Sequence, residues 1–276
     1  MGNLGDITCR ALEVLRSVEA IACEDTRHAR PLLDHYGIQA STFPLHEHNE
    51  RAAAEKLIER LRAGQRVALI SDAGTPAVSD PGARAVVAVR AAGFPVIPLP
   101  GPNAAVTALS ASGLAEGPFV FVGFLPPKTV ARRKVIAQWR SVPAALVFYE
   151  APHRIEETVA DLVAELPADR ELVIARELTK LFEQIVRLPL HEAPAWLAGD
   201  ANHRRGEFVL AVSAPAEATA LDGETDRILS LLLAELPTKT AARIAAELTG
   251  LPRNDLYQRI LTLKDDRASG DQGTAP

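Results

Sequence analysis

The stretch RVALISDAGTPAVSDPGARAVVAVRAAGFPVIPL, residues 66–99, decides the fold class. Its apolar run at 66–71 predicts a buried strand, which a loop at 72–82 connects to a predicted helix at 83–92. A second apolar run at 94–99 predicts the next strand. Strands of about five residues that alternate with helices of about ten are typical of a parallel sheet in an α/β domain.

The same alternation continues on both sides of this stretch. Up to residue 112, we predict helices at 6–17, 51–63 and 104–112 and a short strand at 18–23. Further along, apolar runs predict strands at 119–124, 144–149, 172–176, 179–187 and 207–212, and helical patterns fall at 128–141, 154–165 and 194–198. Because GLAEGP at 113–118 separates the two halves, we predict a parallel-sheet α/β domain over 1–116 and a mixed α+β domain over 117–214.

A third region follows a linker at 214–225. Helical patterns at 225–235, 238–249 and 253–263, with Gly250 in the second turn, predict a helix-turn-helix-like extension over 225–264. It is either an RNA-docking module or a helical hairpin packed on the body or on a partner subunit. The polar residues 265–276 predict a disordered tail.

Composition and charge exclude several classes of protein. The chain has 276 residues and a formal net charge of −5, which is not typical of a protein that coats nucleic acid non-specifically. The two cysteines, Cys9 and Cys23, form no CxxC pair, so we expect neither a disulfide framework nor a metal site. No apolar run reaches the length of a membrane span, so we expect a soluble, cytoplasmic protein without membrane contact.

Three loops follow predicted strands or open the chain, and ligands of an open parallel sheet bind at such loops. They are SDAGTP with SDPG behind it at 71–82, PLPGPN at 98–103, and GNLGD at 2–6. Gly74 permits positive φ, and Asp72 and Asp80 can accept hydrogen bonds from hydroxyl or ammonium groups. None matches a Walker loop or GxGxxG, which disfavours a nucleoside triphosphate or dinucleotide. Each loop taken alone is equally well explained as a plain turn that caps a helix.

Ten motifs in fixed order resemble one family. They are GNLGDIT at 2–8, EDTR at 24–27, SDAGTP at 71–76, SDPG at 79–82, PLPGPNA at 98–104, GFLP at 123–126, FYE at 148–150, HR at 153–154, ARELTK at 175–180 and RRGEFVL at 204–210. The set resembles the bacterial 16S rRNA (cytidine-2′-O)-methyltransferases, the ribosomal small-subunit methyltransferase I family of the tetrapyrrole methylase superfamily. The resemblance implies the two-domain tetrapyrrole-methylase fold and 2′-O-methylation of a decoding-centre cytidine of 16S rRNA in the 30S subunit.

The resemblance also implies a cofactor site. S-adenosylmethionine would lie in the cleft between the two domains, and the enzyme would work as a homodimer without a metal. Together with the loop chemistry, this predicts cofactor contacts at Leu4, Asp72, Gly74, Thr75, Asp80, Pro100, Ala105, Val106, Tyr149, Ala175 and Gly206. One departure concerns the start of the chain. The family has a strand just before GNLGDIT, whereas only Met1 precedes Gly2 here, so we expect the first sheet to lack that strand.

Methyl transfer to a hydroxyl needs a base or a cation that stabilises the alkoxide. The candidate bases are Glu24, Asp25, His46 and Glu177, and Arg27, Arg176 and Lys180 are candidates for binding phosphate or stabilising charge. The sequence does not choose among them. The competing explanations are helix capping for Glu24 and Asp25, a solvated loop for His46, and an ion pair at a strand end for Glu177 and Lys180.

RNA contacts would come from basic clusters, since phosphate contacts dominate affinity. The clusters are Lys128, Arg132, Arg133 and Lys134, and His203 to Arg205, although either cluster can be a solvated surface. Two other functions remain open. One is a small-molecule methylase for a tetrapyrrole-type substrate, and EDTR, ARELTK and the C-terminal helices disfavour it. The other is a non-catalytic helix-turn-helix binding protein, which the intact cofactor loops disfavour.

Overall fold

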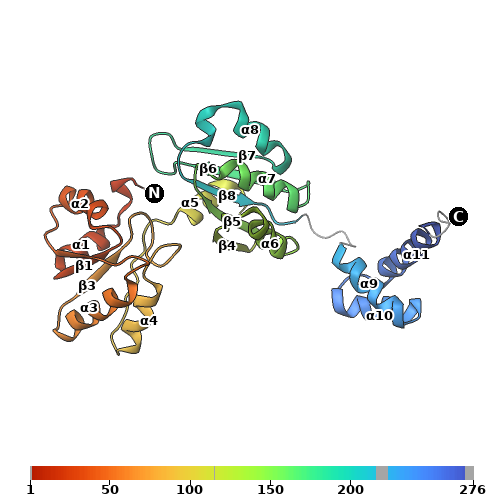
Figure 1. The fold of residues 1–276 in the computed structure, drawn as a ribbon, viewed down its shortest axis with the longest axis horizontal. Coiled ribbons are helices and arrows are strands. Elements are labelled where there is room, and N and C mark those ends of the chain that lie inside the picture. The colour runs from red at the N-terminus through yellow and green to blue at the C-terminus, as the bar shows by residue number, and fades with distance from the viewer. Residues whose placement is uncertain (1, 115, 216–222, 271–276) are drawn as a thin grey trace. The chain divides into compact units, whose positions relative to one another are not determined.

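The computed structural model describes residues 2–114, 116–215 and 223–270, with the backbone alone at 223–224 and 265–270. The chain forms two compact units, Met1–Pro215 and Ala216–Pro276. Among the described residues, the first unit holds two sheets and the second holds three helices (Figure 1). No helix in the described ranges is both long and apolar enough to cross a membrane.

The first sheet is parallel and has the order β2-β1-β3, with β1 at Ala20–Cys23, β2 at Ser41–Pro44 and β3 at Val67–Ile70. Every residue of β1 is buried, as expected for a central parallel strand covered on both faces. Side chains alternate along β1: Ala20 and Ala22 pack with α3 (Glu50–Arg62) and α4 (Ala83–Ala91). Ile21 and Cys23 pack with α1 (Cys9–Ser17) and α2 (Thr26–His35). The period of two therefore gives the layered α/β arrangement.

The strand predicted at 94–99 is wrong, because these residues form no ladder with another strand. Pro95 and Pro98 lack the N–H that a ladder needs, which explains an extended segment without strand pairing. The helix predicted from residue 6 starts at Cys9. Its start is set by Thr8, whose Oγ1 accepts a hydrogen bond from the Ala11 N–H, after a 3-10 turn (η1) at Leu4–Asp6. Helix α2 and strand β2 were not predicted, and Pro31 within α2 disguises its helical pattern.

The second sheet has the order β4-β5-β8-β6-β7 and mixes parallel and antiparallel pairs. Its strands are β4 (Phe119–Phe124), β5 (Ala145–Glu150), β6 (Glu171–Arg176), β7 (Gln184–Pro189) and β8 (Phe208–Val212). One face packs against α6 (Thr129–Trp139), α7 (Ile155–Glu165) and α8 (Ala193–Gly199). The strand predicted at 179–187 is realised as β7, after a turn at 177–183. Two short 3-10 helices, η2 (Leu190–Glu192) and η3 (Ala201–Arg204), flank α8.

Helix α5 (Ala104–Ser112) covers the other face of the second sheet, although it precedes the GLAEGP segment. Its buried residues Ala105, Ala108 and Leu109 pack with Val147 and Val209 of the sheet. The loop before α5 thus carries the chain from the first sheet to the second. The predicted boundary at 116 stays a prediction.

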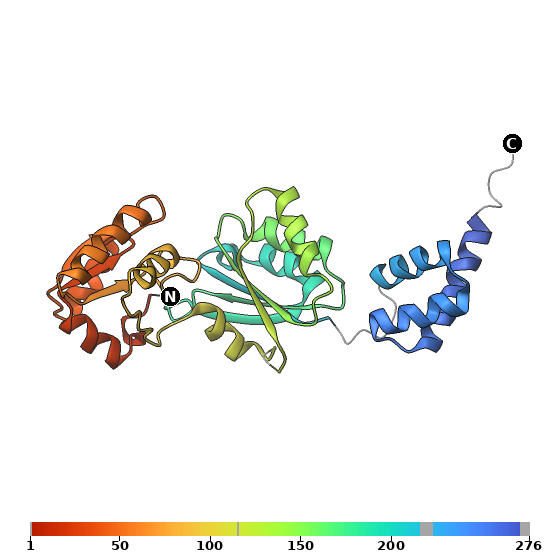
Figure 2. The same ribbon diagram turned by 90° about the horizontal axis from the view of Figure 1, so that it is seen from below.

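The second unit consists of α9 (Gly223–Glu235), α10 (Thr238–Thr249) and α11 (Arg253–Gly270), drawn in blue in Figure 2. Three alanines of α10, Ala241, Ala242 and Ala245, are fully buried against Leu256 and Ile260 of α11. Helix α11 runs to Gly270, past the predicted start of the tail at Asp265. The rest of that tail, 271–276, and most of the predicted linker, 216–222, lie outside the described residues. The α/β fold class with a helical extension is confirmed.

Candidate active site

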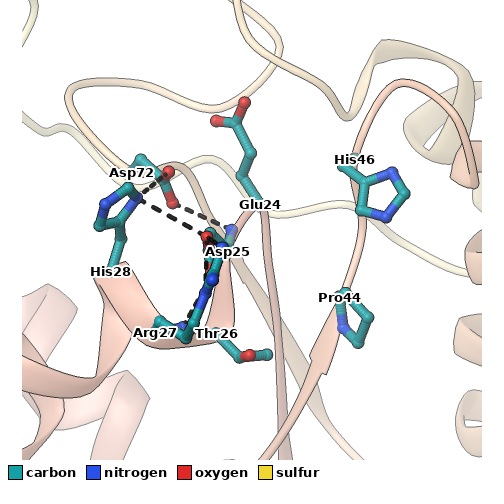
Figure 3. Close-up of a pocket in the computed structure, with 8 residues that line it drawn as sticks. All are labelled: Glu24, Asp25, Thr26, Arg27, His28, Pro44, His46 and Asp72. Atoms are coloured by element: carbon teal, nitrogen blue, oxygen red, sulfur yellow. Dashed lines mark hydrogen bonds and ion pairs between the residues drawn. The ribbon is translucent and has the colours of Figure 1, made fainter.

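An open pocket of about 390 Å³ lies at the carboxyl ends of the three strands of the first sheet (Figure 3). Glu24 and Asp25 directly follow β1, Pro44 ends β2, and Asp72 comes just after β3. The full lining is Glu24, Asp25, Thr26, Arg27, His28, Pro44, His46 and Asp72. The parallel order of the strands therefore brings three of the four predicted bases, Glu24, Asp25 and His46, into one pocket. Arg27 and Asp72 line the same pocket.

Asp72 joins two strand ends. Its Oδ1 accepts a hydrogen bond from the Asp25 N–H at 3.0 Å, and its Oδ2 lies 2.8 Å from Nδ1 of His28. Both oxygens of this carboxylate are thus engaged within the pocket, which places Asp72 against residues 24–28. The sequence predicted Asp72 as a cofactor contact and did not single out His28, although His28 lies four residues after Glu24 in the EDTRH segment.

Asp25 acts as a helix cap in this structure. Its Oδ1 accepts a hydrogen bond from the Arg27 N–H at 2.8 Å, and its Oδ2 pairs with Nη2 of Arg27 at 2.6 Å. These hydrogen bonds from Arg27 hold the pKa of Asp25 well below its usual range. A carboxylate of such low basicity is a weak general base, so the capping explanation fits Asp25 better.

Glu24 has the opposite electrostatic environment. Burial, and then the negative charge of Asp72, raise the pKa of Glu24 above its usual value. Figure 3 shows its carboxylate projecting away from the Asp25–Arg27 pair. Burial, with the charges of Glu24 and Asp72 nearby, also raises the pKa of Asp80 to about 6. Perturbed carboxyl groups gathered in this way are typical of functional sites.

His46 lies on the far side of the pocket from His28 (Figure 3). Its backbone N–H donates to Oδ1 of Asn49 at 2.8 Å, which fixes the loop. Its Nδ1 is buried and makes no hydrogen bond within the described part of the chain. A buried polar atom without a partner is uncommon in native structures, so in the pocket lining it marks His46 as a candidate ligand contact.

The predicted cofactor loops converge on the start of α5. The Thr75 hydroxyl donates to the carbonyl of Pro102 at 2.9 Å, and the Thr8 hydroxyl reaches the carbonyl of Pro100 at 3.4 Å. Gly74 has φ +92°, a conformation that disfavours any side chain, and lies beside the same Pro102 carbonyl. Segments distant in sequence thus form one continuous wall of small residues and backbone groups.

The start of α5 is already hydrogen-bonded. The Ala105 N–H donates to the Tyr149 hydroxyl at 3.2 Å, and the Val106 N–H donates to Oδ1 of Asn103 at 3.1 Å. The backbone N–H groups of these two predicted cofactor contacts therefore already have partners in this structure. Val106 is 56% exposed next to buried Ala105, which leaves apolar surface open at the start of α5.

The loop at 72–82 is strained at two residues and hydrogen-bonded at its end. Ala77 and Ser79 have φ of +66° and +60°, a conformation that costs roughly 1–3 kcal/mol for residues with a side chain. Buried Glu50 stabilises the loop end, because its Oε1 accepts hydrogen bonds from the N–H groups of Gly82 (3.0 Å) and Arg84 (2.8 Å) at the start of α4. Sequence analysis missed this cap, since Glu50 is 32 residues before Gly82.

Glu177 and Lys180 form an ion pair outside the pocket lining. Nζ of Lys180 donates to Oε1 of Glu177 at 2.7 Å and to Oε2 of Glu207 at 3.0 Å. The Glu207 N–H also donates to Oε1 of Glu177 at 3.0 Å. Burial alone would raise the pKa of Glu177, but these hydrogen bonds outweigh it and lower the pKa. A Cβ at Gly206 would lie 2.3 Å from Cγ of Glu177, so glycine is required there.

Two further predicted cofactor residues, Leu4 and Ala175, have structural contacts of their own. The Leu4 carbonyl accepts a hydrogen bond from the Tyr36 hydroxyl at 2.7 Å, which connects the opening turn to the residue just after α2. Ala175 is fully buried in β6, where it packs with Ala105 and Tyr149. Within the described ranges, no group of three His, Cys, Asp or Glu side chains is arranged to hold a metal ion.

The first basic cluster is largely structural. Arg132 is only 1% exposed and pairs with Asp161 at 2.5 Å and Glu157 at 3.2 Å, so the hypothesis that it contacts RNA is wrong. Arg133 also pairs with Asp161, at 2.6 Å. In the second cluster, His203 stacks on Trp196 with ring centroids 3.8 Å apart. A run of basic letters in sequence cannot separate a buried ion pair from a solvated patch.

Comparison with known proteins agrees with this architecture. A family model described as Tetrapyrrole (Corrin/Porphyrin) Methylases matches residues 1–194, and one described as RsmI C-terminal HTH domain matches residues 219–264. The ribosomal RNA small subunit methyltransferase I of Escherichia coli O157:H7 is 50% identical over 262 residues, which cover 95% of this chain and 92% of that protein. The protein of the same name from Pseudomonas aeruginosa is 49% identical, with 95% and 94% covered.

The chain belongs to the ribosomal RNA small subunit methyltransferase I family. Within the wider tetrapyrrole methylase fold, it resembles the uroporphyrin-III-C-methyltransferase of Thermus thermophilus, with a TM-score of 0.55 and 22% identity over 77% of this chain and 90% of that one. It also resembles a diphthine synthase, with a TM-score of 0.57 and 18% identity over 77% and 86%. The family membership confirms the predicted resemblance and makes this chain a methyltransferase.

Proposed function

We propose that this methyltransferase transfers a methyl group from S-adenosylmethionine to the ribose 2′-hydroxyl of a decoding-centre cytidine in 16S rRNA. The observation that carries the proposal is the polar pocket at the strand ends of the first sheet, where Asp72 at the start of the loop at 72–82 lines it. Relatives about 50% identical over nearly the whole chain carry the name of a small-subunit rRNA methyltransferase. The same proposal includes the 30S subunit as substrate particle, a homodimer and a cytoplasmic location.

The chemistry of the small-residue wall fits S-adenosylmethionine. We assign the cofactor to the surface formed by Gly74, Thr75, Pro100, Val106 and Tyr149. Backbone groups there suit the polar parts of the molecule, and the exposed Val106 side chain suits the adenine ring. The cofactor supplies an electrophilic methyl group bound to a positively charged sulfur. Ala105, Ala175, Leu4 and Gly206 support this surface by packing or backbone contacts.

The protein's own task is to position the acceptor and manage its proton. Glu24, Asp25 and Asp72 line the pocket, and Asp80 lies close enough for the charges of Glu24 and Asp72 to raise its pKa. This gathering of carboxyl groups favours an approaching sulfonium. Arg27 is 88% exposed at its side chain, so it can contact a phosphate of the acceptor strand while it stays paired with Asp25. We place Glu177 and Lys180 in a supporting ion pair behind Gly206, not at the reacting atoms.

The test is methyl transfer from labelled S-adenosylmethionine to 30S subunits of cells that lack the endogenous enzyme, with 50S subunits as control. We expect label on one cytidine ribose of 16S rRNA and none on 50S rRNA. Label on a base, or on a tetrapyrrole offered in parallel, would overturn the proposed acceptor. Sedimentation of the pure protein checks the homodimer.

A further inference from the structure

We propose that His28, held by Asp72, is the general base that accepts the proton of the 2′-hydroxyl. This inference deepens the proposed function and rests on it. The supporting observation is the 2.8 Å contact between Nδ1 of His28 and Oδ2 of Asp72 within the pocket lining. A base oriented by a hydrogen-bonded carboxylate is the arrangement that activates hydroxyl nucleophiles in many enzymes.

Asp72 fixes the tautomer of His28. An ionised carboxylate only accepts hydrogen bonds, so the proton of the neutral imidazole lies on Nδ1. The lone pair is then on Nε2, for which no hydrogen bond is found among the described residues. The His28 side chain is 70% exposed, so Nε2 is open to a substrate in the pocket. Asp72 itself cannot rotate freely, because its other oxygen accepts the Asp25 N–H.

The charged groups around His28 favour its function near neutral pH. Three surround it besides Asp72: Asp25, whose Oδ2 lies 4.0 Å away, Arg27, and Glu24 at the end of β1. The hydrogen bond and charge of Asp72, followed by the charge of Asp25, raise the pKa of His28, and Arg27 opposes them. The upward shift starts from about 6.5, and a general base works best when its pKa lies near the operating pH.

The proposed step conserves atoms and charge. The 2′ O–H bond breaks and its proton moves to Nε2 of His28. An electron pair of the oxygen forms the new O–CH3 bond, while the S–CH3 bond breaks and leaves its pair on sulfur as a neutral thioether. The imidazolium then returns its proton to solvent. Glu24 is the competing base, since its raised pKa also increases its basicity.

The kinetic experiment compares wild type with His28→Asn, Asp72→Asn and Glu24→Gln, with His35→Asn as matched control on the exposed far end of the same helix. We expect kcat of His28→Asn to fall by roughly 10²–10⁴-fold, with the acid limb of the pH profile lost. In Asp72→Asn that limb should move to lower pH. In a further variant, His28→Ala, imidazole added to the buffer should restore part of the lost activity. Unchanged affinity for S-adenosylhomocysteine would exclude misfolding.

A second measurement does not depend on turnover. Nitrogen NMR of the free protein should show the Nδ1–H tautomer of His28 and a pKa that falls in Asp72→Asn. Full activity of His28→Asn, or an acid limb that disappears only in Glu24→Gln, would overturn the proposal. If wild type fails to methylate a ribose, the proposed function fails instead. In that case, an Nε2–H tautomer or a pKa unaffected by Asp72→Asn would separately refute the dyad.

Discussion

Replacing Gly206 by alanine tests whether glycine is required beside the Glu177–Lys180 ion pair, just before β8. Gly206 has φ +92°, and an ideal Cβ there would lie 2.3 Å from Cγ and 2.7 Å from Oε1 of Glu177. Gly93 offers a matched control, because its φ is +87° but a Cβ there would meet nothing within 4 Å. Gly93→Ala therefore measures backbone strain alone, whereas Gly206→Ala measures strain together with displacement of Glu177.

The magnitudes differ enough to measure. Alanine at positive φ destabilises the folded state by about 1–2 kcal/mol. Alanine also lowers the conformational entropy of the unfolded chain, which offsets about half of that cost, so Gly93→Ala should lower the free energy of unfolding by about 1 kcal/mol. In Gly206→Ala, Glu177 must move away from the Glu207 N–H. Loss of a charged acceptor costs about 1.5–3 kcal/mol. The partly exposed Lys180 pair adds roughly 0.5 kcal/mol. We expect a total loss of about 3–4.5 kcal/mol.

Urea unfolding followed by circular dichroism measures these free energies. The decisive comparison repeats Gly206→Ala in a Glu177→Ala background, where the clash is absent. In the Glu177→Ala background, Gly206→Ala should lower the free energy of unfolding only as much as Gly93→Ala does. If Gly206→Ala costs no more than Gly93→Ala, or costs the same with and without Glu177, the steric explanation for glycine at this position is wrong.

Three other predictions follow from burial and charge. Burial, with nearby carboxylates, raises the pKa of Cys23 to about 11. Iodoacetamide at pH 8 should therefore modify only the exposed Cys9 in the native protein, and rapid labelling of both cysteines would contradict this. The pKa of Asp80, about 6 in the folded state, exceeds its unfolded value, so Asp80 contributes stability at low pH that is lost as pH rises through about 6. Asp80→Asn should therefore become more stable relative to wild type from pH 4 to 7, as thermal unfolding would show; a constant difference would refute it. Arg132→Met should cost about 2 kcal/mol in urea unfolding, because the buried Asp161 carboxylate loses one of its two arginine partners and keeps only Arg133. Exposed Lys134→Met should cost little, and equal effects of the two variants would contradict the buried pair.

Local pattern was sufficient for most elements of the fold. Helix α5 and strand β4 have the predicted bounds, because Asn103 caps the helix and a dense apolar run forms the strand. The segment 94–99 was predicted wrongly because strand formation needs a pairing partner, which apolar content cannot supply. Helix α2 was missed because Pro31 lies inside it.

The sequence by itself determined the family, the alternating α/β layers and the loops that carry polar residues. Those properties depend on residues near one another in the chain, through apolar periodicity, capping and glycine or proline at turns. Only the tertiary structure decided which polar groups meet. Asp72 and His28 are 44 residues apart, and Arg132 and Asp161 are 29 apart. Strand order and helix packing decide which residues distant in the chain come into contact. Those contacts distinguish His28, which lies in a pocket, from Arg132, which is buried in an ion pair.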